Sequence, residues 1–326
     1  MATKEEVTNR VRNGEKSSLR GIIFIASDAR SGSTMLDLLL SSHTEIESVG
    51  ELRHLQEYYT NNESCMCGRP ITECHFWSSV EGEVSRDSQF VKHNGLKSLQ
   101  TKIRKGKHRM HQYLPSFIEI FLIFASKKMA TKWGKYFPAV RDAMVTAENC
   151  IHICEAVSRV SGCPYIVDSS KWAEQFKAVY LLRPDLIKVI YLVRDGRGVA
   201  CSQLRRSTLD MKKATLFWVL NNVKIMLMKL TVPNEKVLFV RYEDLCRNRR
   251  FEIPRILRFI GVMGQADDLR VRKVGGHNVG GSPHRFDRRQ EEIILDEGWK
   301  ERLSKADLAV FQRFGASVNR WLGYVE

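Results

Sequence analysis

Four short apolar runs, each leading into a polar turn, limit how this chain can fold. They cover residues 22–26, 165–167, 188–193 and 237–241. Each run is apolar or β-branched almost throughout, which is typical of strands covered on both faces. Helical patterns lie between the runs, and this alternation predicts an α/β fold built on a parallel sheet. Ligands of such sheets bind at the carboxyl ends of the strands, so the polar turns are the first candidates for a functional site.

Composition narrows the class of protein. The 326 residues include 52 Lys and Arg against 37 Asp and Glu, a net charge of +15 that favours anionic ligands, nucleic acid or membrane surfaces. No apolar run approaches the ~20 residues of a membrane-spanning helix, and residues 1–20 lack the apolar region of a signal peptide. We therefore expect a cytoplasmic protein without a membrane anchor, whose eight cysteines are thiols rather than a disulfide framework.

The turn after the first run has the pattern of an anion-binding loop. It reads Ser-Asp-Ala-Arg-Ser-Gly-Ser-Thr over positions 27–34. A strand, a small glycine turn and a helix together aim backbone N–H groups and hydroxyls at a phosphate. The residues available for this are Ser31, Gly32, Ser33 and Thr34. A nucleoside-triphosphate loop would place a lysine directly after the glycine, but here the cation is Arg30, before it. An ordinary glycine turn with a surface arginine is the alternative.

The turn after the third run repeats the arrangement. Arg194 ends the strand, and Ser202 lies eight residues later in the predicted helix. Ser202 and Arg206 are four residues apart, so we expect them to share one helix face. Two arginines and a hydroxyl form a good phosphate pocket. Two separate phosphate sites on one sheet predict a ligand with phosphates at two ends.

Taken together, Arg-Ser-Gly-Ser-Thr after the first strand and Arg-Asp-Gly-Arg with Ser202 beyond it resemble the sulfotransferase family, in its Golgi, tyrosylprotein and bacterial branches. The resemblance implies 3′-phosphoadenosine 5′-phosphosulfate as co-substrate and no catalytic metal. It implies that the first loop holds the 5′-phosphosulfate, with Arg30 near the sulfuryl group, and that Arg194, Ser202 and Arg206 hold the 3′-phosphate.

The resemblance also implies the architecture. We expect a parallel sheet flanked by helices, like that of P-loop NTPases, in a single domain over residues 1–326. Its core would comprise residues 20–57 and 150–326. Residues 58–149 would form a mostly helical, basic insertion that covers the acceptor site; a solvated helix face is the alternative for its charges.

Sulfuryl transfer needs a base that takes the proton of the acceptor. The resemblance implies Glu51, because a Gly-Glu lies at a similar distance past the loop in the tyrosylprotein branch. Glu51 could instead be a surface acid or pair with Arg53. His43 and His54 remain alternative bases, since the cytosolic branch uses a histidine.

The transfer also needs cations that stabilise the leaving phosphate. Lys171 follows the second run, at the expected carboxyl edge of the sheet, and is a candidate for this role. Pairing with Asp168 is the structural alternative.

A late glycine-rich segment, 275–286, resembles the Asn-Val-Gly segment of the tyrosylprotein branch. The resemblance places Ser282 near the reactive group, and Arg285 would add charge against the phosphate. Tyr242 resembles a family position that lines the nucleotide site. A surface loop and a core tyrosine are the respective alternatives.

The cysteine-rich segment at residues 65–77 allows three interpretations. Cys65, Cys67, Cys74 and His75 fall within eleven residues but do not match a standard zinc spacing. They could hold a structural metal, form a local disulfide, or be free thiols in a turn under Trp77. We favour free thiols.

Two other functions compete with sulfuryl transfer. A nucleoside-triphosphate kinase or GTPase would use the same type of sheet, but the Gly-Lys-Ser/Thr signature is missing. A nucleic-acid-binding role would use the basic stretch 97–141, which lacks interleaved aromatic residues for base stacking. We expect no nucleic-acid partner, and an acceptor that is a small molecule or carbohydrate rather than a protein. Neither its identity nor the oligomeric state can be read from the sequence.

Overall fold

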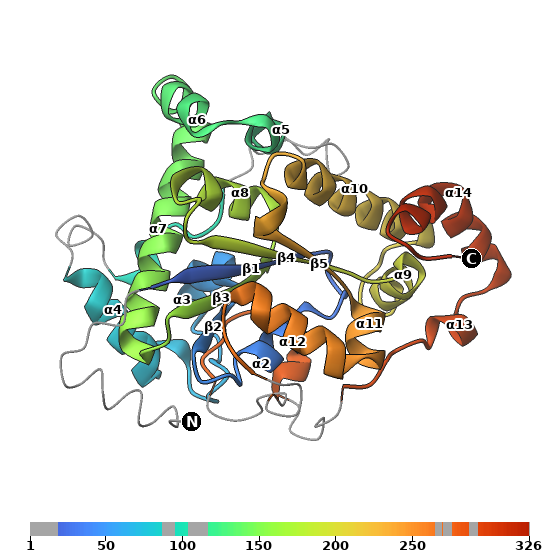
Figure 1. Cartoon of the computed structure of the whole chain (residues 1–326), viewed down its shortest axis with the longest axis horizontal. Helices are drawn as coiled ribbons and strands as arrows, with labels where there is room; N and C mark the ends of the chain where they lie inside the picture. Colours follow the sequence, from blue (N-terminus) through green and yellow to red (C-terminus); the bar gives the residue numbers. More distant parts are fainter. Residues whose placement is uncertain are drawn as a thin grey trace.

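The computed structural model describes residues 19–86, 95–103, 117–264, 269, 276–286 and 293–325. Five strands form one parallel sheet in the order β2-β3-β1-β4-β5 (Figure 1). The strands are β1 (Gly21–Ser27), β2 (Ile46–Gly50), β3 (Tyr165–Lys171), β4 (Ile187–Val193) and β5 (Val237–Arg241). The expected α/β fold with a parallel sheet is therefore confirmed.

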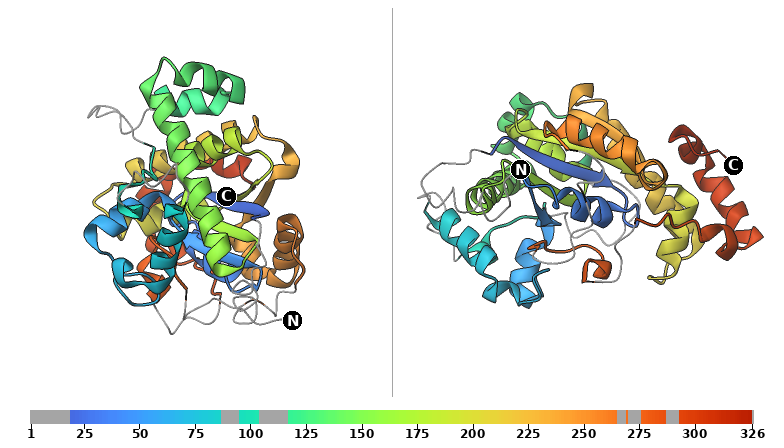
Figure 2. Two further views of the ribbon diagram at one scale, coloured as in Figure 1. Left: turned by 90° about the vertical axis from the view of Figure 1, so that its left-hand side faces the viewer. Right: turned by 60° about the horizontal axis from the view of Figure 1, so that its bottom comes forward.

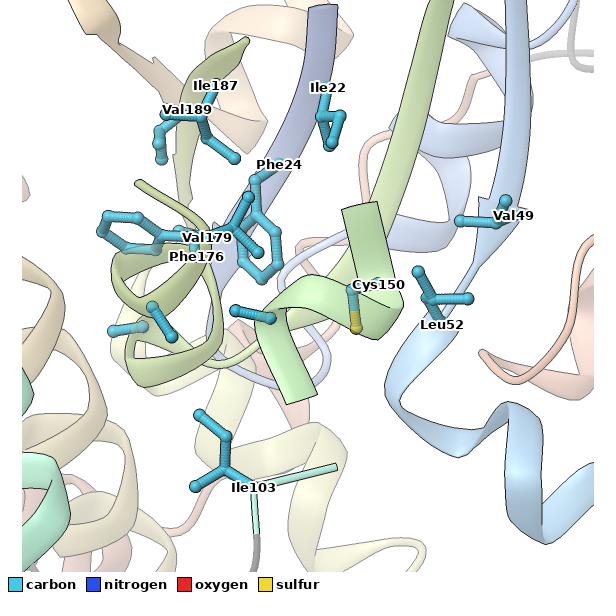
Figure 3. Close-up of a cluster of buried hydrophobic side chains, with 14 of the residues drawn as sticks. Ile22, Phe24, Val49, Leu52, Ile103, Cys150, Phe176, Val179, Ile187 and Val189 are labelled. Atoms are coloured by element: carbon cyan, nitrogen blue, oxygen red, sulfur yellow. The ribbon is translucent and has the colours of Figure 1, made fainter. Parts of the chain in front are cut away.

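Strand β1 shows why the central runs are apolar throughout. Ile22 and Phe24 pack into a core with α7 (Pro138–Ser161), α8 (Ala173–Leu182) and α10 (Met211–Lys229) (Figure 3). Ile23 and Ile25 pack on the opposite face, against α2 (Ser33–Leu40) and α12 (Arg249–Ile260). Because successive side chains point to opposite faces, a strand between two helical layers needs apolar residues at every position.

The sequence reading missed strand β2. Its residues are Ile-Glu-Ser-Val-Gly, and all five are buried. The polar pair Glu47 and Ser48 interrupts the apolar pattern that marks the other strands. Ser48 is satisfied by donating to the carboxylate of Asp37, from helix α2. In this edge strand, hydrogen bonds of buried polar side chains thus take the place of the apolar pattern seen in the other strands.

The described part of the expected insertion is mostly helical. It contains the end of α3 (Leu55–Asn61), α4 (His75–Ser85), α5 (Phe117–Phe124), α6 (Lys127–Gly134) and the first half of α7. Helices α5 and α6 gather at one end of α7, and α4 packs against α7 farther along (Figure 2). Of the basic stretch, Lys97 and Lys102 are described, whereas Arg104, Lys105, Lys107 and Arg109 lie outside the described residues.

The remaining helices support the carboxyl edge of the sheet. They are α9 (Gly196–Leu204), α11 (Tyr242–Arg247), α13 (Trp299–Arg302) and α14 (Lys305–Trp321). Helix α14 packs on α9 and α10, and its buried Asn319 accepts the backbone N–H of Gly196 at 2.9 Å. The end of the chain therefore braces the turn that follows β4. Among the described residues, no helix has the length and apolar character to cross a membrane.

Candidate active site

The turn between β1 and α2 is shaped by two left-handed residues. Gly32 caps α2 with φ of +90°, and Arg30 has φ of +71°. A Cβ on Gly32 would lie 2.6 Å from a ring carbon of Tyr242, so only glycine fits there. Tyr242 itself is buried, and its ring packs under the loop. The turn leaves the first N–H groups of α2 without helical partners, as an anion-binding loop requires.

The two predicted phosphate sites meet at Arg30. Its Nε donates to Ser202 Oγ at 3.0 Å, and its carbonyl accepts Arg194 Nη1 at 3.1 Å. Burial lowers the pKa of Arg30, and the positive charges of Arg206, Arg194 and Arg205 lower it further. Three arginines thus repel the Arg30 guanidinium in a partly desolvated turn, and Asp296 opposes them only in part. A bound anion would relieve this repulsion.

Arg206 lies near this cluster, but not on a helix as expected. Helix α9 ends at Leu204, so the expectation that Ser202 and Arg206 share a helix face is wrong. Arg206 lies in the turn beyond the helix, exposed, and still acts on the pKa of Arg30. The turn keeps the charge within electrostatic range of the loop.

Asp296 is a member of the site that sequence reasoning missed. Its carboxylate pairs with Arg194 Nη2 at 3.1 Å, and its carbonyl accepts the same nitrogen at 2.7 Å. The Arg194 guanidinium lies 4.7 Å from the centre of the Tyr242 ring. These contacts fix the guanidinium beside the loop. Asp296 is about a hundred residues from Arg194 in a segment without a recognisable motif, so no local pattern announces it.

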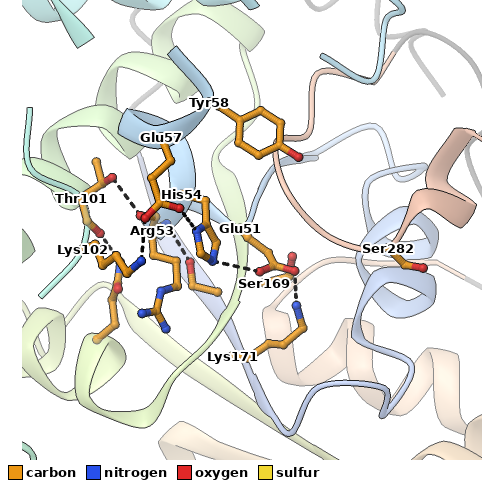
Figure 4. Close-up of polar contacts among 12 residues, drawn as sticks. Glu51, Arg53, His54, Glu57, Tyr58, Thr101, Lys102, Ser169, Lys171 and Ser282 are labelled. Atoms are coloured by element: carbon orange, nitrogen blue, oxygen red, sulfur yellow. Dashed lines mark hydrogen bonds and ion pairs between the residues drawn. The ribbon is translucent and has the colours of Figure 1, made fainter. Parts of the chain in front are cut away.

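Glu51, Lys171 and His54 form a second polar group, at the carboxyl ends of β2 and β3 (Figure 4). Lys171 Nζ donates to Glu51 Oε1, and His54 Nε2 lies 3.6 Å from Glu51 Oε2. The side chains of Glu51 and Lys171 are only 13% and 14% exposed. Because so little of the two side chains is exposed, water screens their charges only weakly, and the carboxylate and the ammonium stay in contact at the site.

The structural alternatives for these residues are not observed. The Arg53 guanidinium lies 4.3 Å from the centre of the Trp172 ring, and the direct cationic partner of Glu51 is Lys171. Asp168 accepts the backbone N–H of Ser170 at 2.9 Å. The alternatives of Glu51 pairing with Arg53 and of Lys171 pairing with Asp168 are therefore wrong.

The rival base His43 lies at the other end of strand β2. It precedes the strand, whereas Glu51 follows it. His43 is buried, with Nε2 2.8 Å from the carbonyl of Met263 and Nδ1 accepting the N–H of Glu45. Both ring nitrogens are occupied far from the carboxyl edge of the sheet.

The late glycine-rich segment joins Glu51 to the anion-binding loop. Val279 forms a parallel bridge with Gly50, and its carbonyl accepts the N–H of Glu51 at 2.7 Å. A Cβ on Gly280 would lie 2.7 Å from Glu51 Cβ, so the two backbones are in close contact. The N–H of Ser282 then donates to Thr34 Oγ1 at 3.3 Å. The structure thus brings together Glu51, Thr34 and Ser282.

The Ser282 hydroxyl and the Arg285 guanidinium of this segment have different surroundings. Ser282 Oγ is buried and has no hydrogen-bond partner among the described residues. Arg285 is buried and donates to Tyr58 Oη at 2.9 Å and to the Ser64 carbonyl at 3.4 Å. The hydrogen bonds of Arg285 are therefore with Tyr58 and Ser64 and not with the anion-binding loop.

One buried carboxylate, Asp37, ties the surrounding elements together. It accepts the Ser169 hydroxyl at 3.0 Å and the Asn278 amide at 3.1 Å, in addition to Ser48. Burial raises its pKa to about 6, and the hydrogen bonds oppose this effect. Helix α2, strands β2 and β3 and the late segment therefore converge on one side chain.

Sequence and structure comparisons place the chain among known proteins. Among curated proteins, none matches it in sequence. Of solved structures, the sulfotransferase domain of the Synechococcus PCC 7002 olefin synthase matches with a TM-score of 0.50 and 18% identity, over 92% of this chain and 96% of that one. The sulfotransferase domain from the curacin biosynthetic pathway matches with 0.46 and 18%, over 91% and 98%. Mouse sulfotransferase SULT7A1, complexed with PAP, matches with 0.42 and 9%, over 98% and 92%.

The family model gives the assignment. A model described as "Sulfotransferase family" matches residues 23–266, which hold β1 from its third residue, the other four strands, the anion-binding loop and the Glu51–Lys171 pair. The match covers well over half of the chain and includes both motifs that prompted the expectation. This protein accordingly belongs to the sulfotransferase family and is an enzyme that depends on 3′-phosphoadenosine 5′-phosphosulfate.

Proposed function

We propose that the enzyme transfers the sulfuryl group to a hydroxyl or amine of a small molecule or carbohydrate, with Glu51 as the general base. The observation that carries this proposal is the contact of Glu51 with Lys171 at the point where the late segment reaches Thr34. A candidate base, a cation and an anion-binding loop thus adjoin one another. General-base catalysis requires such an approach of the base to the reacting atoms.

The co-substrate would be held at both ends. The backbone N–H groups and hydroxyls of residues 31–34 would bind its 5′-phosphosulfate, and Arg194, Ser202 and Arg206 its 3′-phosphate. Arg30 contacts the Ser202 hydroxyl and lies in the first loop, so it would carry charge between the two phosphates. Tyr242 would line the nucleotide site from beneath Gly32. Arg285, which is held by Tyr58 and Ser64, would add positive charge on the phosphate side.

The transfer would proceed by in-line displacement at sulfur. The acceptor oxygen or nitrogen forms a bond to sulfur while the bond from sulfur to the 5′-phosphate oxygen breaks. Glu51 takes the acceptor proton, and the electron pair of the broken bond stays on the phosphate, where Lys171 and Arg30 stabilise it. Ser282, whose buried hydroxyl has no partner among the described residues, would donate to the transferring group. Positioning and charge stabilisation carry most of this catalysis, as in phosphoryl transfer.

Glu51 is favoured over His54 as the base by the hydrogen bonding of the histidine. His54 Nδ1 lies 2.6 Å from Glu57 Oε2, and its other nitrogen faces Glu51 at 3.6 Å. The imidazole is thus placed between two carboxylates, where it would orient Glu51. Its side chain is also more exposed, at 29% against 13% for Glu51.

The first test is a titration of the purified chain with 3′-phosphoadenosine 5′-phosphate, following the melting temperature. A ligand that binds the folded state raises its stability by mass action. We expect a rise that Arg194→Ala abolishes. Arg183→Ala is the matched control, because Arg183 lies before β4 and pairs with Asp185 on the surface. A rise with ATP and Mg²⁺ but none with the bisphosphate would refute the proposal in favour of a kinase.

The second test separates the two candidate bases. A panel of alcohols, phenols, sugars and amines is incubated with labelled co-substrate, and label transfer is measured. Glu51→Gln should lower turnover by about 10²–10⁴-fold while leaving bisphosphate affinity unchanged. Glu57→Gln, on the far side of His54, is the control and should retain turnover. If His54→Gln abolishes turnover and Glu51→Gln does not, the base is the histidine.

A further inference from the structure

Three cysteines and a histidine converge beside the active site. Cys65, Cys67 and Cys74 come from the turn between α3 and α4, and His277 comes from the late segment about 200 residues away. Their three sulfur atoms and the histidine nitrogen all lie within 4.8 Å of one another. His75, the histidine suggested by sequence proximity, is exposed instead. The histidine of this cluster could not be found from local spacing.

The distances match the edges of a tetrahedron around a metal ion. With Zn–S of about 2.3 Å and Zn–N of about 2.0 Å, tetrahedral ligands are about 3.8 Å apart for two sulfurs and about 3.5 Å for a sulfur and a nitrogen. The observed separations are 3.7 Å between Cys67 and Cys74, 3.3 Å between Cys74 and His277 Nδ1, and 3.8 Å between Cys65 and His277 Nδ1. A sulfur–sulfur distance of 3.7 Å far exceeds the roughly 2.05 Å of a disulfide bond.

The ligand atoms are held by the surrounding backbone and rings. The Cys65 N–H donates to the Arg69 carbonyl at 2.9 Å and closes a tight turn in which Gly68 has φ of +91°. The His277 ring stacks on Phe76 at 4.4 Å between centres, with an angle of 4° between the ring planes. Trp77 Nε1 donates to the His277 carbonyl at 2.8 Å. Fixed ligand orientation of this kind characterises metal sites.

We propose that Cys65, Cys67, Cys74 and His277 bind a structural Zn²⁺ ion. Three thiolates and one imidazole complete a four-coordinate shell, which leaves no open position for substrate and suits a structural rather than a catalytic ion. Soft sulfur ligands in a tetrahedral arrangement favour zinc over magnesium, calcium or manganese. Cys65 and Cys74 are fully buried, so the ion would sit largely out of water.

The ion would fasten the late segment to the rest of the protein. His277 is followed by Asn278, which donates to Asp37, and by Val279, which bridges Gly50. The same segment delivers Ser282 to Thr34. Zinc would therefore hold the loop that, under the proposed function, closes over the co-substrate. This second part depends on that function, whereas metal binding does not.

The test is the metal content of the full-length chain, purified under reducing conditions without chelator and measured by plasma mass spectrometry. We expect one zinc per chain, lost in His277→Ala and Cys74→Ser. His75→Ala is the matched control and should retain the metal, because His75 is adjacent in sequence but points to solvent. Should the first two variants fail to fold, His277→Cys supplies a fourth thiolate and should restore both folding and zinc. Cobalt reconstitution of metal-free protein should give the visible absorption of a tetrahedral thiolate site.

Three results would overturn the site. They are a reduced wild-type chain that binds no zinc even after reconstitution, zinc content that His277→Ala leaves unchanged, and a disulfide between Cys67 and Cys74 found by peptide mapping of chain purified without reductant. Coupling to the loop is read separately, from the affinity for 3′-phosphoadenosine 5′-phosphate, which removal of zinc should weaken by at least about tenfold. Zinc binding with unchanged bisphosphate affinity refutes the coupling alone. Zinc binding without any bisphosphate binding refutes the proposed function and leaves the metal site standing.

Discussion

Replacing Gly50 by alanine should separate the late segment from strand β2. Gly50 has φ of +70°, and a Cβ there would lie 2.2 Å from the Val279 carbonyl oxygen and 2.7 Å from the Val279 nitrogen. Both contacts are with backbone, so neither can be relieved by a side-chain rotation. The bridge must open, and the hydrogen bonds from Glu51 N–H to Val279 and from Val279 N–H to Val49 are then lost.

The expected loss of stability follows from these two effects. A left-handed conformation costs alanine roughly 1–2 kcal/mol, and each lost backbone hydrogen bond costs about 0.5–1.5 kcal/mol. Together they amount to about 2–5 kcal/mol of unfolding free energy. Equilibrium unfolding in urea measures this quantity directly, provided that the transition is cooperative.

Gly323→Ala supplies the control. Gly323 has a similar φ of +87°, but an added Cβ would meet only ordinary contacts, the nearest being 3.5 Å from Arg241 Nη1. Its cost should be the left-handed component alone, roughly 1–2 kcal/mol. Gly50→Ala should also weaken bisphosphate binding, because the displaced segment carries Ser282 away from Thr34. Equal costs for the two variants, with bisphosphate binding intact in both, would show that the bridge contributes nothing.

Three further outcomes are expected. Ser202→Ala removes the hydroxyl that Arg30 contacts at 3.0 Å and should raise the bisphosphate Kd about tenfold in calorimetric titration. Lys171→Met should lower turnover by about 10²–10³-fold, with bisphosphate still bound, in the label-transfer assay. Burial raises the pKa of Asp37 from 3.8 to about 6, so its stabilising contribution is complete below the unfolded value and is lost as pH rises through the folded one. Relative to Asp37→Asn, urea unfolding should therefore show the wild type losing about 2 kcal/mol between about pH 4 and pH 7; a constant difference would contradict the raised pKa.

The parts of the fold that the sequence predicted are those with a local cause. Strand β1 lies between two apolar layers, so five consecutive residues had to be apolar, and this pattern predicted the strand. The anion-binding loop could be predicted in the same way, since Arg30, Gly32 and Thr34 fall within five residues. Strand β2 was missed because the buried Glu47 and Ser48 interrupt the apolar pattern, and Ser48 is satisfied by hydrogen bonds with Asp37 and Asn278 from other segments.

The parts of the site that sequence reasoning missed depend on contacts between distant segments. His277 joins cysteines some 200 residues away, while the adjacent His75 turns to solvent. Asp296 reaches Arg194 from the segment before α13. Neither pairing leaves a periodicity or spacing in the sequence. The expectation for Arg206 was wrong for a more local reason, because helix α9 ends two residues before it.

The left-handed backbone conformations of Arg30 and Lys171 cost stability, whereas the proposed activity needs both side chains. These two cations stand at the ends of neighbouring strands β1 and β3, with φ of +71° and +72°. Glycine at either position would relieve roughly 1–2 kcal/mol of backbone strain, against the roughly 0.5–1 kcal/mol that the entropy of glycine costs. Loss of the Lys171–Glu51 pair and of the Arg30–Ser202 hydrogen bond would offset this gain, so a screen that rewards thermal stability alone does not by itself require either charge. Retaining them requires a selection that measures turnover, and stabilising mutations are better sought away from this edge of the sheet.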